Sequence, residues 1–177
     1  MAGGANVPVM DDEERKAKFL EAMSRGSTFV AVLTTDGEGG RFGVTVSSMT
    51  SVAAEGVAPT ILACVHQLSP AANAILRNKH FCANILHESQ QEISDLFSGR
   101  QRTEHGQRFD AVNWSRSGNG QPLISGATAN FECLLQTSVL WETHHVLIAH
   151  VLAVHLNDDP RALLYGQRAY RRAIDID

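Results

Sequence analysis

Cysteine is scarce in this 177-residue chain, and neither basic charge nor long apolar runs are prominent. The three cysteines, Cys64, Cys82 and Cys133, each lie in an apolar, strand-like segment and form no CxxC pair. This argues against a disulfide framework or a zinc site and predicts small buried side chains. A formal net charge of -4 and a pI near 6.0 leave no basic footprint, so nucleic acid and anionic membranes are not expected as principal partners.

No apolar run approaches the length of a membrane-spanning helix, and the first residues lack the basic and apolar regions of a signal peptide. We therefore expect a cytoplasmic protein whose partners are small molecules or protein surfaces. A length of 177 residues suits one domain. Residues 1–10 carry glycine and proline without a periodic pattern, which predicts a flexible tail ahead of a domain over residues 11–177.

The apolar pattern predicts mostly strands with a few helices around them. An acidic start followed by an apolar stripe predicts a helix over residues 11–25, and Ser69-Pro70 and the capping-box pattern from Ser89 to Glu92 predict two more. The β-rich runs cover residues 28–35, 42–52, 60–65, 81–86, 122–124, 129–141 and 145–156. Few helices separate these runs, which favours an antiparallel barrel with peripheral helices over a parallel fold. The polar segment 100–120 is too long for a tight turn and is predicted to be a functional or partly disordered loop.

The stretch from Gly43 to Val52 is rich in hydroxyl groups and contains no charged side chain. Read as one strand, it becomes polar on both faces towards its end. One interpretation is a row of donors for a phosphate, a sugar-like chain or the edge of a heteroaromatic ring. The other is a half-exposed edge strand whose hydroxyls face water, and the residues alone leave both open.

Histidines gather at the start of a late strand, where His144 and His145 precede His150 and His155. Strand alternation separates these side chains, and no HxH or HExxH spacing occurs, so we predict no metal site. An imidazole at a strand start can hydrogen-bond a carboxamide or phosphate, or simply lie at a surface turn. Near the end of the chain, Tyr170 and its neighbouring arginines suit either a ligand phosphate and a pocket cover, or a solvated terminal segment.

Taken in order, these segments resemble the flavin reductase family of FMN-binding split barrels over about residues 22–171. Residues 43–52 resemble that family's flavin strand, and residues 81–86 resemble its next shared strand. Residues 94–99, Arg108-Phe109, residues 122–127 and the Tyr-Arg ending follow in the expected order. The resemblance implies a mainly β, antiparallel Greek-key split barrel with peripheral helices, paired into a homodimer with flavin sites near the subunit interface.

The activity implied by the resemblance is hydride transfer from NADH or NADPH to FMN or FAD, with reduced flavin supplied to a partner monooxygenase. Thr45 and Ser47 are then expected to face the isoalloxazine edge, and His144 to orient the nicotinamide without serving as an obligatory acid. The other implied cofactor-binding residues are Val46, Ser48, Ser51, Val52, Ser69, Asn84, Tyr170 and Arg171, with Ser48, Ser51, Ser69 and Asn84 serving the ribityl chain or phosphate. A site of such neutral donors would hold phosphate moderately and release reduced flavin.

Some positions depart from the family pattern. Thr143 stands in place of an acid, Ala149 in place of a glycine, and His150 where an acid is common. Residues 53–59 exceed the family's short proline-containing turn, which predicts a reshaped pocket rim. The alternatives are a flavin-binding module without efficient turnover, a barrel for a non-flavin ligand, or a cob(II)yrinic acid a,c-diamide reductase, a subgroup with a similar His-His-Val-Leu sequence.

Overall fold

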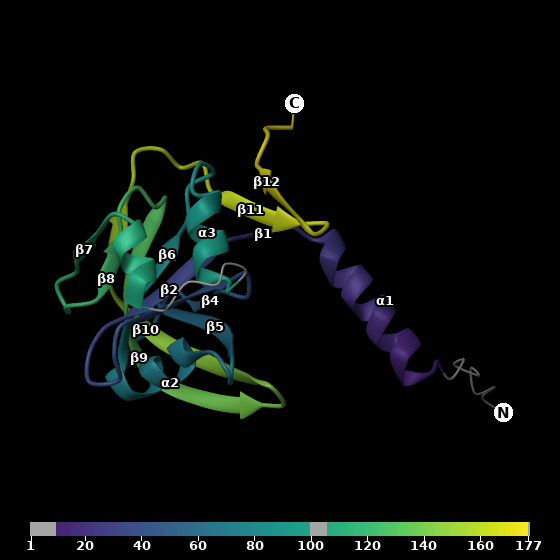
Figure 1. Ribbon diagram of the computed structural model, residues 1–177, viewed down its shortest axis with the longest axis horizontal. Coiled ribbons are helices and arrows are strands. Elements are labelled where there is room, and N and C mark those ends of the chain that lie inside the picture. Colours follow the sequence, from purple (N-terminus) through teal and green to yellow (C-terminus); the bar gives the residue numbers. More distant parts are fainter. Residues whose placement is uncertain (1–9, 100–105, 177) are drawn as a thin grey trace.

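The structure is a computed structural model that describes residues 10–99 and 106–176, and its described part is mainly antiparallel β-sheet with three α-helices (Figure 1). The largest sheet contains β2 (Ala31–Thr35), β3 (Phe42–Val46), β4 (Thr50–Ala53), β5 (Thr60–His66), β6 (His80–Ile85), β9 (Ala129–Trp141) and β10 (His144–Leu156). Its strands lie in the order β3-β2-β6-β9-β10-β5-β4, and every neighbouring pair is antiparallel. The predicted antiparallel β architecture with peripheral helices is therefore confirmed.

This sheet is curled. Strand β3 forms one edge of the sheet, yet it contacts β5, which lies next to the opposite edge. The concave side encloses an apolar core to which β2, β5, β6 and β10 contribute Leu33, Val65, Phe81 and Leu147, each at most 1% exposed. Burial of such a side chain contributes roughly 1.5–3 kcal/mol to folding, so this core holds the curled shape.

A second apolar cluster lies on the outer side of β2. Val32 points away from the first core and packs in this cluster with Leu86, Phe97, Phe109 and Ile124. The covering elements are α3 (Gln91–Phe97), the 3-10 helix Gly106–Ala111, β7 (Trp114–Arg116), β8 (Pro122–Ile124), β1 (Thr28–Phe29), β11 (Leu163–Gly166) and β12 (Ala169–Arg172). Both faces of β2 are thus buried, which explains why it reads as a continuous buried run instead of an alternating one.

The first helix, α1 (Asp12–Arg25), begins where the sequence predicts and projects away from the sheet (Figure 1). The Asp11 carboxylate caps it by accepting a hydrogen bond from the Glu14 N–H at 2.8 Å. Its apolar stripe does not pack on the other described residues, since Phe19, Leu20 and Met23 are 61%, 53% and 65% exposed. Among the described helices, none combines the length and apolar character needed to cross a membrane.

The other two helices test the predicted start signals. Helix α2 (Pro70–Asn78) begins with proline in its first turn, as predicted. The prediction of a capping box at Ser89 is wrong. Helix α3 starts two residues later at Gln91, and the Ser89 hydroxyl lies 2.8 Å from the His87 ring instead of capping the helix.

The hydroxyl-rich stretch is not one strand, so that prediction is wrong. Strand β3 ends at Val46 and β4 begins at Thr50, because β3 pairs with β2 at one edge of the sheet while β4 pairs with β5 at the other. Residues 47–49 carry the chain between these edges, and Met49, 7% exposed, packs in the core. The hydroxyl groups therefore lie where the curled sheet comes together, and no regular alternation relates them.

Two predicted segments fall partly outside the described residues: the tail over residues 1–10, apart from residue 10, and residues 100–105 of the loop 100–120. The described part of that loop contains the 3-10 helix and β7.

Candidate functional site

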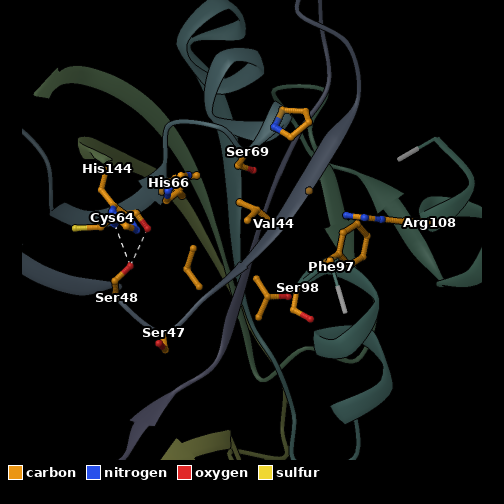
Figure 2. A pocket seen from close by; sticks show the side chains of 16 residues that line it. Val44, Ser47, Ser48, Cys64, His66, Ser69, Phe97, Ser98, Arg108 and His144 are labelled. Atoms are coloured by element: carbon orange, nitrogen blue, oxygen red, sulfur yellow. Dashed lines mark hydrogen bonds between the residues drawn. The ribbon is translucent and has the colours of Figure 1, made fainter. Parts of the chain in front are cut away.

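A pocket of about 530 Å³ opens where β3 approaches β5 (Figure 2). The start of α2, the end of α3 and the 3-10 helix complete its wall. The lining residues are Gly43, Val44, Thr45, Val46, Ser47, Ser48, Cys64, Val65, His66, Ser69, Pro70, Phe97, Ser98, Gly99, Arg108 and His144. Six of the predicted site residues therefore meet here: Thr45, Val46, Ser47, Ser48, Ser69 and His144.

Two of the hydroxyls hold the pocket wall together. Thr45 donates a hydrogen bond of 2.7 Å to the Ser94 carbonyl of α3. Ser48 donates to the Cys64 carbonyl at 2.9 Å and accepts from the Cys64 N–H at 3.1 Å (dashed in Figure 2). These bonds attach the last part of β3 to α3 and the residues that follow β3 to β5.

Two other hydroxyls are available to a ligand. The Ser47 and Ser69 side chains have no hydrogen-bond partner in the part of the chain that the structure describes. Ser69 is the residue before α2, but its hydroxyl does not cap the helix. Both can donate or accept, which suits the carbonyl and amide groups of a heteroaromatic ring or the hydroxyls of a sugar-like chain.

The flat part of the wall is the Phe97 ring. A Cβ at Gly43 would lie only 2.6 Å from two carbons of this ring, so glycine at this position allows the ring to pack directly on β3. Phe97 is 1% exposed and meets Phe109 edge to face, with ring centroids 5.2 Å apart. The ring is therefore fixed in place before any ligand binds.

Two imidazoles lie side by side on the opposite wall. His144 and His66 are direct partners in the β10–β5 pairing, and their ring centroids are 5.0 Å apart in an edge-to-face arrangement. The His144 Nδ1 lies 2.9 Å from the Thr143 hydroxyl, and the His66 Nδ1 accepts the Leu68 N–H at 3.1 Å. Each ring thus has its Nδ1 engaged, which leaves both Nε2 atoms for a ligand.

Arg108 supplies the charge of the pocket. Its side chain extends from the 3-10 helix beside Phe97 (Figure 2), and the residue is only 6% exposed. Its Nε has no hydrogen-bond partner among residues 10–99 and 106–176. Burial lowers the pKa of the Arg108 guanidinium, but arginine remains charged at neutral pH. Among the residues that the structure describes, no aspartate or glutamate lines the pocket. The neutral donors of residues 43–52 are therefore accompanied by a charged donor, and the described lining favours an anion.

Other predicted residues lie elsewhere. Asn84 is fully buried, where its amide donates to the Val32 carbonyl at 2.8 Å and its oxygen accepts from Ile124 N–H and Asn130. This network links β2, β6, β8 and β9, so Asn84 is not brought into the pocket. Ser51 and Val52 lie on exposed β4, beyond the pocket lining.

The two residues from the end of the chain sit next to the site. Tyr170 lines a hollow of about 130 Å³ that shares Thr45, Val46 and Ser47 with the main pocket. Its hydroxyl donates to the Asp95 carboxylate at 2.7 Å and lies 2.9 Å from the Ser94 hydroxyl. Arg171 bonds the Gly166 carbonyl and Gln167 and faces away from the main pocket.

Residues 53–59 do not line the pocket rim, so that prediction is wrong. They connect β4 to β5 at the Thr60 end of β5, whereas Cys64 and His66 at its other end line the pocket. Six residue steps lead from Thr60 to His66, a span of about 20 Å along the strand.

Sequence reasoning did not predict the other lining residues, among them His66, Phe97 and Arg108. The sequence indicated Arg108-Phe109 only as one of the segments in the family's order, because nothing in the sequence shows that Arg108 is buried with no partner for its Nε among the described residues. Among the described residues, no group of three or more metal-ligating side chains comes together.

Comparisons with known proteins identify the family and the fold of the chain. The family model for the flavin reductase like domain matches residues 23–173. The FMN reductase (NADH) RutF of Pantoea ananatis is 34% identical over 167 residues, which cover 93% of this chain and 86% of that protein.

Two solved structures show the same fold. One is BorF, the flavin reductase component of a bacterial two-component tryptophan halogenase, with a TM-score of 0.81, 28% identity, and coverage of 91% of this chain and 99% of that one. The other is a homolog of nitrilotriacetate monooxygenase component B from Mycobacterium thermoresistibile, with a TM-score of 0.83, 26% identity, and coverage of 93% and 89%. With the family model spanning most of its length, this chain belongs to the flavin reductase like domain family.

Proposed function

We propose that this protein is an NADH-dependent flavin reductase that reduces FMN. The observation that carries the proposal is the pocket of about 530 Å³, which combines a fixed aromatic wall, two unpartnered hydroxyls and a buried arginine. Its volume falls within the usual range for small-molecule sites, about 300–1,000 Å³. A flavin has a flat ring, a hydroxylated chain and a phosphate, and each part finds a matching group here. The similarity to an FMN reductase (NADH) over 93% of the chain supports the same choice of substrates.

The backbone of β3 can bind a ligand as well as its side chains can. Because it is an edge strand of the described sheet, one side of its backbone has no strand partner, and its N–H and C=O groups are available to a ligand. We assign Thr45, Val46 and Ser47 to the isoalloxazine edge, mainly through this backbone. Ser48 and Ser69 serve the ribityl side. Ser51, Val52, Asn84 and Arg171 are left out of the assignment because they do not line the pocket.

The chain contributes positioning to the reaction. A bound flavin supplies the hydride acceptor, and NADH supplies the hydride. Phe97 and Val44 provide an apolar wall for the flavin ring, and the pocket opening leaves room for the nicotinamide to stack on that ring. Such a site accelerates the reaction mainly by holding the flavin and nicotinamide rings in contact in a reactive orientation. Hydride transfer between them needs no protein nucleophile.

His144 orients the nicotinamide in this proposal. Its Nδ1 is held by the Thr143 hydroxyl at 2.9 Å, so the Nε2 can reach the carboxamide. The Thr143 hydroxyl thus does for this histidine what an acid at that position would do, which is to fix the ring orientation.

We also propose the assembly and the place of action. The fold is a Greek-key split barrel that forms a homodimer in the cytoplasm, where NADH is available, and supplies reduced flavin to a partner oxygenase. The proposed homodimer is supported by exposed apolar side chains on α1 and at the ends of β9 and β10, which a second copy of the chain would cover. They include Phe19, Met23, Trp141 and Leu156. The two-component systems named for the similar structures support the oxygenase partner.

Steady-state oxidation of NADH and NADPH with added riboflavin, FMN or FAD tests the function. We expect stimulation by flavin, with FMN and NADH as the preferred pair and FAD and NADPH as slower substrates. Flavin binding without any stimulated turnover would favour a binding module, and no binding of any flavin would remove the proposal.

A further inference from the structure

We propose that His66 is a positioning residue that holds the His144 ring in the orientation in which it meets the nicotinamide, an inference that rests on the proposed reductase function. His144 is the first residue of β10 and is exposed. Its Nδ1 lies 2.9 Å from the Thr143 hydroxyl, and this contact fixes one atom of the ring but not the plane of the ring. A neutral hydroxyl also forms a weaker hydrogen bond to an imidazole than a carboxylate does. A second contact is therefore needed to fix the orientation of His144.

The first argument is that the His66 ring supplies this contact. His66 and His144 are opposite each other in the antiparallel β5–β10 pair, where side chains of directly paired residues lie close together. Their ring centroids are 5.0 Å apart and their planes meet at 82°, the edge-to-face arrangement that aromatic rings prefer (Figure 2). The Thr143 hydroxyl thus sets the direction of the His144 Nδ1, and the His66 ring sets the plane.

The second argument is that His66 is itself held in place. Its Nδ1 accepts a hydrogen bond from the Leu68 N–H at 3.1 Å, so the ring is attached to the turn that follows β5. The same turn is attached to the β9–β10 turn, because the Gln67 N–H donates to the Thr143 carbonyl at 2.9 Å. His66 therefore moves together with the backbone that carries His144, and its ring can serve as a fixed support.

Two variants separate the ring contact from the hydrogen bond of the turn. His66→Asn keeps an acceptor for the Leu68 N–H but removes the ring, whereas His66→Phe keeps an aromatic ring but removes the acceptor. Since His66 is exposed, neither change should unfold the protein. We expect His66→Asn and His66→Ala to raise the KM for NADH by about 2- to 10-fold, the effect of losing an aromatic pair, and His66→Phe to keep it within about twofold of the wild type.

The kcat at saturating NADH and the dissociation constant for FMN should stay within about twofold of the wild-type values in these variants, because the contact to the nicotinamide acts on dinucleotide binding. His150→Ala is the matched control. It removes an imidazole from the same pair of strands, but at the other end of β5, where His150 faces Thr60 and lies outside the described pocket lining. This control should change neither constant.

A double-mutant cycle decides whether His66 acts through His144. In the His144→Ala background, His66→Ala should not raise the KM for NADH further, because the ring that it positions has been removed. The same increase in both backgrounds would show that His66 acts on the dinucleotide directly and would overturn the inference. A normal KM in His66→Asn together with a raised KM in His66→Phe would also overturn it, because the turn and not the ring contact would then determine the affinity.

NMR spectroscopy tests the same contact without turnover. The Cε1–H resonance of His144, assigned by its absence in His144→Ala, should shift in His66→Ala and stay in place in His150→Ala, because a neighbouring ring changes the local magnetic field. An unchanged resonance in His66→Ala would overturn the inference. A wild-type protein whose NADH oxidation no flavin stimulates would overturn the proposed function and this role with it, whereas additive effects in an active wild type would overturn only the role of His66.

Discussion

Replacing Gly43 by alanine tests the closest contact in the pocket wall. The new Cβ would lie 2.6 Å from two carbons of the Phe97 ring, about 1 Å inside normal carbon contact. The ring has little room to retreat, since it is 1% exposed and packs against Phe109. Overpacking of this kind costs about 1–3 kcal/mol. For a domain of this size each kcal/mol corresponds to about 2–4 °C, so we expect the Tm to fall by about 2–12 °C.

The assay is thermal unfolding of Gly43→Ala followed by circular dichroism, together with FMN affinity. Displacement of the Phe97 ring should weaken FMN binding as well as lower the Tm. Gly26→Ala is the control, because the nearest atom to its new Cβ is a backbone oxygen at 3.9 Å and its φ of -79° suits any residue. A Gly43→Ala variant as stable as the control, with unchanged FMN affinity, would refute the packing argument.

The remaining predictions concern the pocket rim, the nicotinamide and a buried carboxylate. Ser47→Leu should weaken flavin binding by about tenfold with little loss of stability, because the side chain is exposed and unpartnered; unchanged affinity in a titration would remove Ser47 from the site. His144→Ala should raise the KM for NADH or slow flavin reduction by about 10-fold or more, with less effect on flavin affinity, and the reverse pattern would contradict its assignment. Burial raises the pKa of Glu132, but hydrogen bonds from His155 and from two backbone N–H groups outweigh this and leave it lowered. Because its pKa is lowered in the folded state, ionised Glu132 stabilises the protein at pH values above the ordinary glutamate pKa, and this stabilisation is lost as the pH falls. Glu132→Gln should therefore be less stable than the wild type at neutral pH and should lose less stability on acidification, as measured by urea titrations. Parallel pH profiles of the two proteins would exclude this role.

Much of the fold could be predicted because local patterns agree with the final structure. The long runs of β9 and β10, the acidic start of α1 and Pro70 at the start of α2 all fold as their composition indicates. The break between β3 and β4 could not be predicted, because residues 43–52 have strand propensity throughout. Only the pairing of β3 and β4 with different strands forces the chain to leave the strand conformation there.

The site shows the same division between local and tertiary information. Hydroxyl content drew attention to Thr45 and Ser48, but the structure shows that these two also attach the wall to α3 and β5. Asn84 has the same donor groups as a ligand-binding amide, and its burial among backbone partners is a tertiary fact. Arg108 is the opposite case, an ordinary arginine in the sequence. Its burial, with no partner for its Nε in the described part of the chain, appears only when the 3-10 helix packs beside Phe97.

The most direct test of the central claim is anaerobic stopped-flow measurement of FMN reduction by NADH. The pocket geometry predicts that purified protein accelerates the bleaching of FMN absorbance in proportion to its concentration, and that the rate saturates with both FMN and NADH. A rate equal to that of FMN and NADH without protein, at concentrations where FMN binds, would contradict the claim that this pocket brings the two rings together.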